Sequence, residues 1–286
     1  MLISGKKVSE AIFDSLKKEV EILKTKNIVP SLVIVRVGDD PASVTYVGNK
    51  LKLCERLGVN GKLIRLEPAA TQEELVSLIN ELNKDNQVNG ILVQLPLPKH
   101  IDETIICQTI SPDKDVDCFN EVNVGKLWSA KKIENNLILP CTPAGIIQLL
   151  KYYNLNISGE DVVIVGRSNI VGKPLAALFL NENATVTICH SRTKDLANKC
   201  AQAKILVAAI GKPKFITKEF TNPNQIIIDV GINRDENGKL CGDVDYENVS
   251  EYVSAISPVP GGVGPMTIIM LSSNLITATK KQHHEN

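Results

Sequence analysis

Tyr46 and Lys50 are four residues apart in the segment 43–58. The apolar residues of this segment recur at the spacing of one helical face: Val44, Val47, Leu51 and Cys54. Residues four apart are neighbours on a helix, so the ring and the amine would lie together at the edge of the apolar stripe. Such a pair can stack a flat substrate and transfer a proton. A solvated lysine beside a half-buried tyrosine is the alternative.

Two further polar residues occupy places where a ligand could bind. Gln94 ends the apolar run 90–94 and precedes the proline-rich sequence LPLP. Ligands of open α/β sheets bind at the carboxyl ends of strands, so Gln94 is a candidate contact. Asp117 lies in the acidic segment 111–120, where its carboxylate could accept paired hydrogen bonds from an aminopyrimidine edge. A turn aspartate is the alternative for Asp117, and Asp115 is the next candidate for its role.

The segment 162–180, VVIVGRSNIVGKPLAALFL, predicts a nucleotide-binding turn. A strand ends at Gly166, a short turn follows, and a helix opens near Gly172. Gly166 would allow the tight turn and Gly172 a close approach to a pyrophosphate, which the N–H groups of a helix start attract. The spacing is G-x-x-x-x-x-G rather than G-x-G-x-x-G, so an ordinary strand–helix turn stays open.

The end of the next strand distinguishes NADP from NAD. NAD-binding folds place an acidic residue about 20 residues further on to bind the ribose hydroxyls. Here the sequence CHSRT ends the strand without a carboxylate, and Ser191, Arg192 and Thr193 offer donors. The arginine fork suits a 2′-phosphate, which predicts NADP. A surface arginine beside a helix that Thr193 caps is the alternative.

Strand-like and helix-like segments alternate along the chain, which is typical of an α/β fold with mostly parallel sheets. Thr71 and Glu74 form a capping box, and Thr142 before Pro143 predicts another helix start. Asn237-Gly238 predicts a hairpin turn. The predicted strands are 31–38, 62–67, 90–98, 161–166, 184–189, 204–211 and 225–231; the predicted helices are 43–58, 72–84, one from 142, and 266–280.

Length and composition set the class of protein. The 286 residues predict two domains with a boundary near 140. Lysine plus arginine and aspartate plus glutamate number 32 each, so no nucleic-acid partner is expected. The apolar run 266–276 is shorter than the ~20 residues of a membrane span, and the start lacks a signal-peptide core; we expect a cytoplasmic protein. Seven cysteines without a C-x-x-C pair predict neither disulfides nor a metal site.

Taken together, these stretches resemble the bifunctional methylenetetrahydrofolate dehydrogenase/methenyltetrahydrofolate cyclohydrolase family. Each motif alone is weak, but the ordered set is specific and covers nearly the whole chain. The matching motifs are YVGNK (46–50), GILVQLPLP (90–98), PDKDVD (112–117), PCTP (140–143), GRSNIVGKP (166–174), HSRT (190–193), AAIGKP (208–213), DVGIN (229–233), GDVD (242–245) and PVPGGVGPMT (258–267).

The resemblance implies an N-terminal folate domain, 1–140, completed by the final helix 266–286, and a Rossmann-like NADP-binding domain, 141–265, with folate in the cleft between them. It also implies a homodimer that serves one-carbon metabolism and purine biosynthesis. In the folate site, Tyr46 would stack on the substrate, Lys50 would be the catalytic amine held by Gln94, and Asp117 would bind the pterin. The cleft-lining loop would contain Pro260, Gly261 and Gly262. NADP contacts would come from Gly166, Arg167, Ser168, Val171, Gly172, Ser191, Arg192, Thr193, Gly211 and Ile232.

The implied chemistry has two steps. The enzyme would transfer a hydride from the methylene bridge of 5,10-methylenetetrahydrofolate to NADP, and would then hydrolyse the methenyl product to 10-formyltetrahydrofolate. Two other classes stay open: a different NADP oxidoreductase, and a folate-binding protein without turnover. The chain has no P-loop motif G-x-x-x-x-G-K-[ST], which excludes a fused ATP-dependent ligase.

The sequence departs from the family pattern at two places. Many members have Gly-Phe-His after the aspartate, where this chain has Cys118, Phe119 and Asn120. A β-carbon at position 118 narrows the backbone conformations of the loop. Many bacterial members carry a basic residue after PCTP, where this chain has Ala144. Neither departure touches the expected chemistry, but they bear on loop mobility and on binding of polyglutamate tails.

Overall fold

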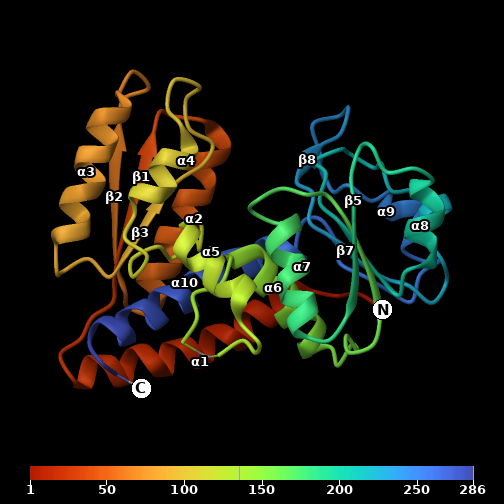
Figure 1. The fold of residues 1–286 in the computed structure, drawn as a ribbon, viewed down its shortest axis with the longest axis horizontal. Helices are drawn as coiled ribbons and strands as arrows, with labels where there is room; N and C mark the ends of the chain where they lie inside the picture. Colours follow the sequence, from red (N-terminus) through yellow and green to blue (C-terminus); the bar gives the residue numbers. More distant parts are fainter. Residues whose placement is uncertain (135, 286) are drawn as a thin grey trace. The chain divides into compact units, whose positions relative to one another are not determined.

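The computed structural model describes residues 1–134 and 136–285 and has an α/β fold with two parallel sheets (Figure 1). The chain forms two compact units. The catalytic unit, as we name it here, contains residues 12–129, 134–141 and 268–286; the nucleotide unit contains 1–11, 130–133 and 142–267. Helices α1 (Gly5–Thr25) and α10 (Val263–Gln282) contribute residues to both.

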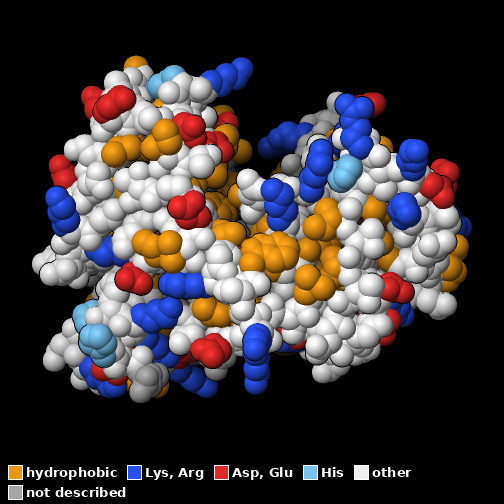
Figure 2. All heavy atoms as spheres, viewed as in Figure 1, with side chains coloured by type: hydrophobic (Ala, Val, Ile, Leu, Met, Phe, Trp, Pro, Cys, Tyr) orange, Lys and Arg blue, Asp and Glu red, His pale blue; other side chains and the backbone are white. Residues whose placement is uncertain are grey.

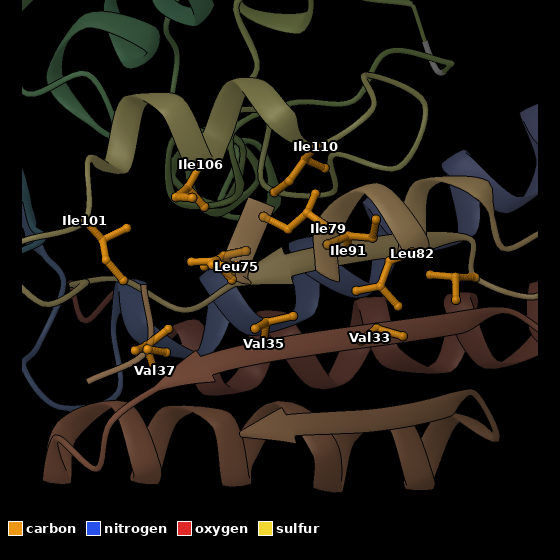
Figure 3. Packing of buried hydrophobic residues seen from close by; sticks show 13 residues of the cluster. Val33, Val35, Val37, Leu75, Ile79, Leu82, Ile91, Ile101, Ile106 and Ile110 are labelled. Atoms are coloured by element: carbon orange, nitrogen blue, oxygen red, sulfur yellow. The ribbon is translucent and has the colours of Figure 1, made fainter. Parts of the chain in front are cut away.

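The catalytic unit is built on a three-stranded parallel sheet in the order β2 (Asn60–Leu66), β1 (Ser31–Val37), β3 (Gly90–Val93). Val33, Val35 and Val37 alternate along β1 and lie on one face of the sheet. On that face they pack in a single apolar cluster with buried residues of α3 (Gln72–Lys84) and α4 (Glu103–Thr109) (Figure 3). Strands buried on both faces form near-continuous apolar runs, and six of the seven residues of β1 are buried. The core therefore holds the carboxyl ends of β1 and β3 in fixed positions.

Local signals set the ends of the two helices that follow β1 and β2. Asp40 caps α2 (Pro41–Leu57) by accepting a hydrogen bond from Ser43 N at 2.8 Å, and Pro41 fills the first helical position. Helix α2 therefore begins two residues before the predicted segment. The predicted apolar stripe is wrong at Val44, which is 42% exposed. The capping box at Thr71 and Glu74 of α3 is confirmed.

The acidic segment 111–120 runs alongside β3. Ile91 and Asp115 form a parallel bridge, and Ile91 N donates to Lys114 O at 2.8 Å. Because this segment and β3 run in the same direction, the residues after Asp115 lie toward the carboxyl end of β3. Helix α5 (Glu121–Ser129) follows, and Gln282 at the end of α10 donates to Asn89 O and Asp113 O. The segment is thus held from two sides.

The nucleotide unit contains a five-stranded parallel sheet in the order β10 (Ala255–Ile256), β7 (Ile226–Asp229), β6 (Ile205–Ala208), β4 (Asp161–Val165), β5 (Thr185–Cys189). The chain leaves β4 toward β5 on one side and continues with β6 on the other. Ligands of such sheets bind where the strand order reverses, at the carboxyl ends of the strands. The end of β4 is therefore the expected nucleotide position. The remaining elements of the unit are α6 (Cys141–Tyr152), α7 (Gly172–Asn181), α8 (Leu196–Gln202), η1 (Lys218–Phe220), β8 (Asn233–Arg234), β9 (Leu240–Cys241) and α9 (Tyr246–Val249).

Residues 1–3 pair with the edge strand β10. Leu2 and Ile256 form a parallel bridge, Ile3 N donates to Ile256 O at 2.9 Å, and Ile256 N donates to Met1 O at 3.0 Å. This pairing explains why residues 1–11 group with the nucleotide unit, whereas we expected them in the first domain.

Several predicted boundaries need correction. Thr142 is not the cap of a helix, because α6 already begins at Cys141 and the Thr142 hydroxyl bonds that of Thr267 at 2.8 Å. Thr193 is not a helix cap either, since α8 begins at Leu196 after Asp195. The hairpin at Asn237-Gly238 is confirmed by the antiparallel pair β8–β9.

Charged side chains of both signs are interspersed over the face drawn in Figure 2, in keeping with equal numbers of acidic and basic residues. Within residues 1–134 and 136–285, no helix is long and apolar enough to cross a membrane.

Candidate active site

Lys50 and Gln94 are brought together from α2 and the end of β3. Lys50 Nζ donates to Gln94 Oε1 at 3.0 Å, and Gln94 Nε2 donates to Leu95 O at 2.7 Å. The second bond fixes which end of the amide faces the lysine. Gln94 N also donates to Val35 O at 2.8 Å, so the residue is anchored to the sheet. An amide oxygen holds the amine in place without a negative charge. A carboxylate at this position would add one.

Tyr46 lies one helical turn before Lys50 on α2, and both side chains are half-buried. Burial raises the pKa of the Tyr46 phenol, so the ring stays neutral over the ordinary pH range. Residues at this spacing share a helix face. The structure therefore offers an aromatic surface and an amine on the same side of α2.

The structure separates the two candidate carboxylates. Asp115 is buried and accepts three hydrogen bonds, from Phe119 N at 3.2 Å, Asn120 N at 2.9 Å and Asn123 Nδ2 at 3.0 Å. Both of its oxygens thus hold the segment itself. Asp117 is half-buried, and among the described residues its carboxylate accepts a hydrogen bond only from the Cys141 thiol, at 3.6 Å. Asp117 is therefore the carboxylate with acceptor capacity left for a ligand.

Burial raises the pKa of Asp117, while the Lys50 ammonium and the thiol hydrogen bond oppose that shift. The segment that contains Asp117 runs parallel to β3 from the Ile91–Asp115 bridge, so Asp117 lies toward the same carboxyl end of β3 as Gln94. Lys50 is bonded to Gln94, and the three side chains therefore belong to one region of the catalytic unit.

Cys141 and Asn274 support this region and were not predicted from the sequence. Asn274, on α10, donates to Val116 O at 2.8 Å and Leu139 O at 2.7 Å, and lies 3.5 Å from Cys141 Sγ. One amide therefore ties the backbone before Asp117 to the thiol that bonds it. The signal available in the sequence was a polar residue, Asn274, inside the apolar run 266–276.

The departure at position 118 has a structural consequence. Cys118 is buried and has φ 62°, in the left-handed region that favours glycine. The loop keeps the conformation that a glycine would adopt, with a thiol packed inside. Asn120 donates to Ile110 O at 3.0 Å and accepts from Val122 N at 2.9 Å, so it holds the loop. Ala144 is buried on α6.

In the nucleotide unit, the predicted cofactor residues follow the ends of successive parallel strands. Gly166, Arg167 and Ser168 follow β4; Ser191, Arg192 and Thr193 follow β5; Gly211 follows β6; and Ile232 follows β7. Ile232 is 51% exposed, which leaves its side chain available for a ligand. The parallel sheet therefore brings all four groups to one edge.

The glycines at this turn are required by the backbone. Gly166 has φ 136°, and a β-carbon there would overlap Ala209 O. A β-carbon on Gly172 would overlap Gly166 O. The prediction that Gly172 leaves room for a pyrophosphate needs refinement, because its missing side chain is needed first for the packing of the turn. Ser168 Oγ accepts from Val171 N at 3.1 Å and Gly172 N at 3.4 Å, which holds the turn that leads into α7.

The segment after β5 is an ordered turn. His190 N donates to Thr193 Oγ1 at 2.8 Å, and Arg192 N donates to His190 Nδ1 at 3.1 Å. The Arg192 side chain is exposed. The turn thus holds the backbone of Arg192, and the exposed guanidinium is accessible to an anion.

The loop 260–262 lies in the nucleotide unit. Gly261 has φ 101°, and its carbonyl accepts from Gly5 N at 2.9 Å. A β-carbon on Gly5 would overlap Gly262 O. Pro260 is exposed. The start of α1 therefore holds this loop in place.

No group of three or more metal-ligating side chains occurs among the described residues. All seven cysteines are free thiols, and six of them are buried.

Comparison with known proteins decides the family. A family model for the tetrahydrofolate dehydrogenase/cyclohydrolase catalytic domain matches residues 3–117, and the model for the NAD(P)-binding domain of the same family matches residues 140–283. This chain belongs to the tetrahydrofolate dehydrogenase/cyclohydrolase family. The predicted family, fold class and enzyme class are confirmed.

Members of the family are similar along the whole chain. The Bifunctional protein FolD of Acetivibrio thermocellus is 54% identical over 281 residues, which cover 98% of this chain and 97% of that protein. The bifunctional FolD crystal structure from Campylobacter jejuni is 47% identical with a TM-score of 0.93, covering 98% of this chain and 99% of that one. The Trypanosoma brucei family member, complexed with NADP cofactor and an inhibitor, is 37% identical with a TM-score of 0.93, covering 98% and 97%.

Proposed function

We propose that this member of the family oxidises 5,10-methylenetetrahydrofolate to 5,10-methenyltetrahydrofolate with NADP and then hydrolyses the product to 10-formyltetrahydrofolate. The observation that carries the proposal is the Lys50–Gln94 hydrogen bond in the same region of the catalytic unit as Asp117. The lysine is an amine held in place for the hydrolytic step, and Asp117 is a carboxylate with acceptor capacity left for folate binding.

The catalytic unit would bind the folate. Asp117 accepts hydrogen bonds from the amino group and ring N–H of the pterin, which are donors only at that edge. The Tyr46 ring stacks on the flat ring system. These two contacts meet parts of the substrate that do not react, so they serve both steps alike by orientation.

In the first step, no protein group has to take up a proton, because the methylene carbon loses a hydride and becomes a methenyl cation. Bound NADP supplies the hydride acceptor. The residues of the chain only have to hold the donor carbon in place and exclude water, and orientation of this kind supplies several kcal/mol of barrier lowering.

In the second step, water adds to the cationic carbon and the ring opens, which requires proton transfers. Lys50 is the group placed to make them. Gln94 directs the amine through its neutral amide oxygen, which places Lys50 to act as a general acid–base group for the addition of water.

The nucleotide unit would bind NADP. The turn after Gly166 and the start of α7 hold the phosphates, and Arg192 pairs with the 2′-phosphate. No carboxylate stands among Ser191, Arg192 and Thr193 to favour the free ribose hydroxyls of NAD. The roles of the loop 260–262 in the folate site, and of Gly211 and Ile232 in cofactor binding, rest on their positions and on the family motifs.

The same proposal includes a homodimer located in the cytoplasm and acting in one-carbon metabolism that feeds purine biosynthesis. Analytical ultracentrifugation of the purified protein tests the dimer: a monomeric mass over a broad concentration range would exclude it. Fractionation of cells of the source organism tests the compartment.

One assay tests the central proposal. The protein is mixed with methylenetetrahydrofolate and NADP, and the absorbances of NADPH and of the methenyl intermediate are followed together. We expect NADPH to accumulate while the methenyl signal stays low. NADPH formed with an equal and persistent methenyl signal would refute the hydrolytic step, and no NADPH would refute the dehydrogenase.

A further inference from the structure

A buried carboxylate in the nucleotide unit has no part in the function described above. Asp243 is 0% exposed and accepts four hydrogen bonds. Its Oδ2 accepts from Ile210 N at 2.7 Å and Gly211 N at 3.1 Å, and its Oδ1 accepts from Lys212 N at 2.8 Å and Asn233 Nδ2 at 2.9 Å. An ionised carboxylate has about four acceptor sites, so the capacity of Asp243 is fully used.

A second buried carboxylate fixes the first. Asp229, at the end of β7, is 2% exposed and accepts from Asp243 N at 2.9 Å, Val244 N at 3.0 Å and Gly231 N at 3.1 Å. Neither aspartate forms a salt bridge with any residue that the structure describes. Backbone N–H groups and the Asn233 amide therefore hold two adjacent acids, which makes the arrangement costly to bury and sensitive to any loss of a donor.

Two glycines are needed to admit these carboxylates. A β-carbon on Gly231 would overlap the Asp243 carboxyl group, and one on Gly242 would overlap that of Asp229. The motifs DVGIN and GDVD, which are separate in the sequence, thus together form one pair of buried carboxylates and the glycines that make room for them.

The segments that Asp243 holds are those at the predicted nucleotide edge. Residues 210–212 follow β6, and Asn233 lies one residue after Ile232, beyond β7. Strand β6 is the neighbour of β4, and the Gly166 turn packs directly on Ala209 O. The loop 210–212 therefore lies beside the turn that would bind the phosphates.

We infer that Asp243 is a positioning residue for the nucleotide site, acting through the loop 210–212 and Asn233 and held in turn by Asp229. This inference rests on the proposed function, because it assumes that NADP binds at this edge. Three of the four donors to Asp243 are backbone N–H groups, which can only donate a hydrogen bond. In Asp243→Asn, the NH₂ group would face one or more of these donors, and the hydrogen bonds that hold that part of the loop would be lost.

The bifunctional protein provides an internal control. Lys50, Gln94 and Asp117 belong to the catalytic unit, so hydrolysis of added methenyltetrahydrofolate reports on folding without using the loop 210–212. A positioning role predicts that Asp243→Asn raises the Kd and KM for NADP about tenfold to a hundredfold, the loss expected for one or two hydrogen bonds to a charged group, with hydrolysis near the wild-type rate. Asp245→Asn, two residues along the chain, is the matched control and should leave NADP binding unchanged.

The experiment titrates each variant with NADP and measures both activities and the thermal midpoint. Unchanged NADP affinity in Asp243→Asn would overturn the inference, as would a parallel fall of both activities with the thermal midpoint. If that variant does not fold, Asn233→Ala decides: it removes one donor and should weaken NADP binding in the same direction by a smaller factor, and no change would overturn the inference. Failure of the proposed function is distinguishable, because the wild-type protein would then not reduce NADP at all.

Discussion

Replacement of Asp117 is the perturbation that best separates folate recognition from chemistry. In the free protein its carboxylate is engaged only by a sulfur donor at 3.6 Å among the described residues. A thiol is a weak donor, so little is lost within the protein when Asp117 becomes alanine. The substitution should therefore lower the affinity for folate, because the amino and ring N–H groups of the pterin lose a charged acceptor.

A hydrogen bond to a charged group contributes about 1.5–3 kcal/mol. Two such bonds share one carboxylate, and water partly replaces them in the mutant, so we take about 2–3 kcal/mol for Asp117→Ala, or about 30- to 150-fold in affinity. The same factor should appear in the KM of both reactions, because the pterin edge is the same in both. Asp117→Asn should also bind poorly, since its NH₂ would face a donor.

The assay titrates each variant with folate and with NADP separately and then measures both steps. Asp115→Asn is the comparison: it removes acceptors for the loop itself, so it should lower the thermal midpoint rather than act on folate alone. NADP affinity should survive in Asp117→Ala. Intact folate affinity in that variant would refute the reasoning. Because burial raises the pKa of Asp117, folate affinity should also fall with decreasing pH at a higher pH than for an ordinary carboxyl group.

Four other outcomes are expected. Lys50→Met should lower methenyltetrahydrofolate hydrolysis by about 100-fold or more and spare part of the dehydrogenase, with exposed Lys52→Met as control; normal hydrolysis would contradict the assignment. Arg192→Ala should weaken NADP binding by about tenfold to a hundredfold and leave NAD binding nearly unchanged, with Lys194→Ala as control; equal losses for both cofactors would show that Arg192 does not contact the 2′-phosphate. Burial raises the pKa of every cysteine thiol, that of half-buried Cys107 to about 12, so a thiol reagent at neutral pH should react slowly with the native protein and fully after unfolding; a rapidly labelled thiol would contradict this. Burial raises the pKa of Asp229 from 3.8 to about 7, so between these values the folded protein holds a proton that the unfolded protein has lost. The free energy of unfolding should therefore fall as pH rises from about 4 to 7, by up to ~4 kcal/mol. Urea unfolding across that pH range should show this fall, and Asp229→Asn should not.

Much of the fold could be predicted from local patterns. Strand β1 is apolar apart from Ser31 and Arg36, and α3 carries its own capping box, so both elements were predicted close to their observed bounds. Helix α1 is not among the predicted elements, although its buried residues Val8, Leu16, Val20 and Leu23 follow helical spacing. Ser4 directly before the helix is a start signal, since its Oγ accepts from Lys7 N at 3.4 Å, but the first turn has no acidic residue to strengthen it.

The two wrong caps share one cause. Thr142 and Thr193 are both residues that favour helix starts, but their hydroxyl groups bond tertiary or turn partners instead: Thr267 in one case and His190 N in the other. The preference of a threonine for helix starts is overridden when its hydroxyl group has another partner, whether distant in the sequence, as for Thr142, or within a turn, as for Thr193.

The site itself depended on contacts that no local pattern contains. Lys50 and Gln94 are 44 positions apart and meet only because α2 and β3 flank the same strand end. The resemblance to the family supplied that pairing. It did not supply Asn274 or the pair Asp229 and Asp243, since their function depends on burial and on which backbone N–H groups converge on them.

The pairing of residues 1–3 with β10 has a practical consequence. An edge strand presents unpaired N–H and C=O groups that can recruit another chain into the sheet. Strand β10 is only two residues long, and the first residues of the chain cover its outer side. Shortened versions that begin after Ile3 would expose this edge and should aggregate more readily during heating or refolding than the full sequence.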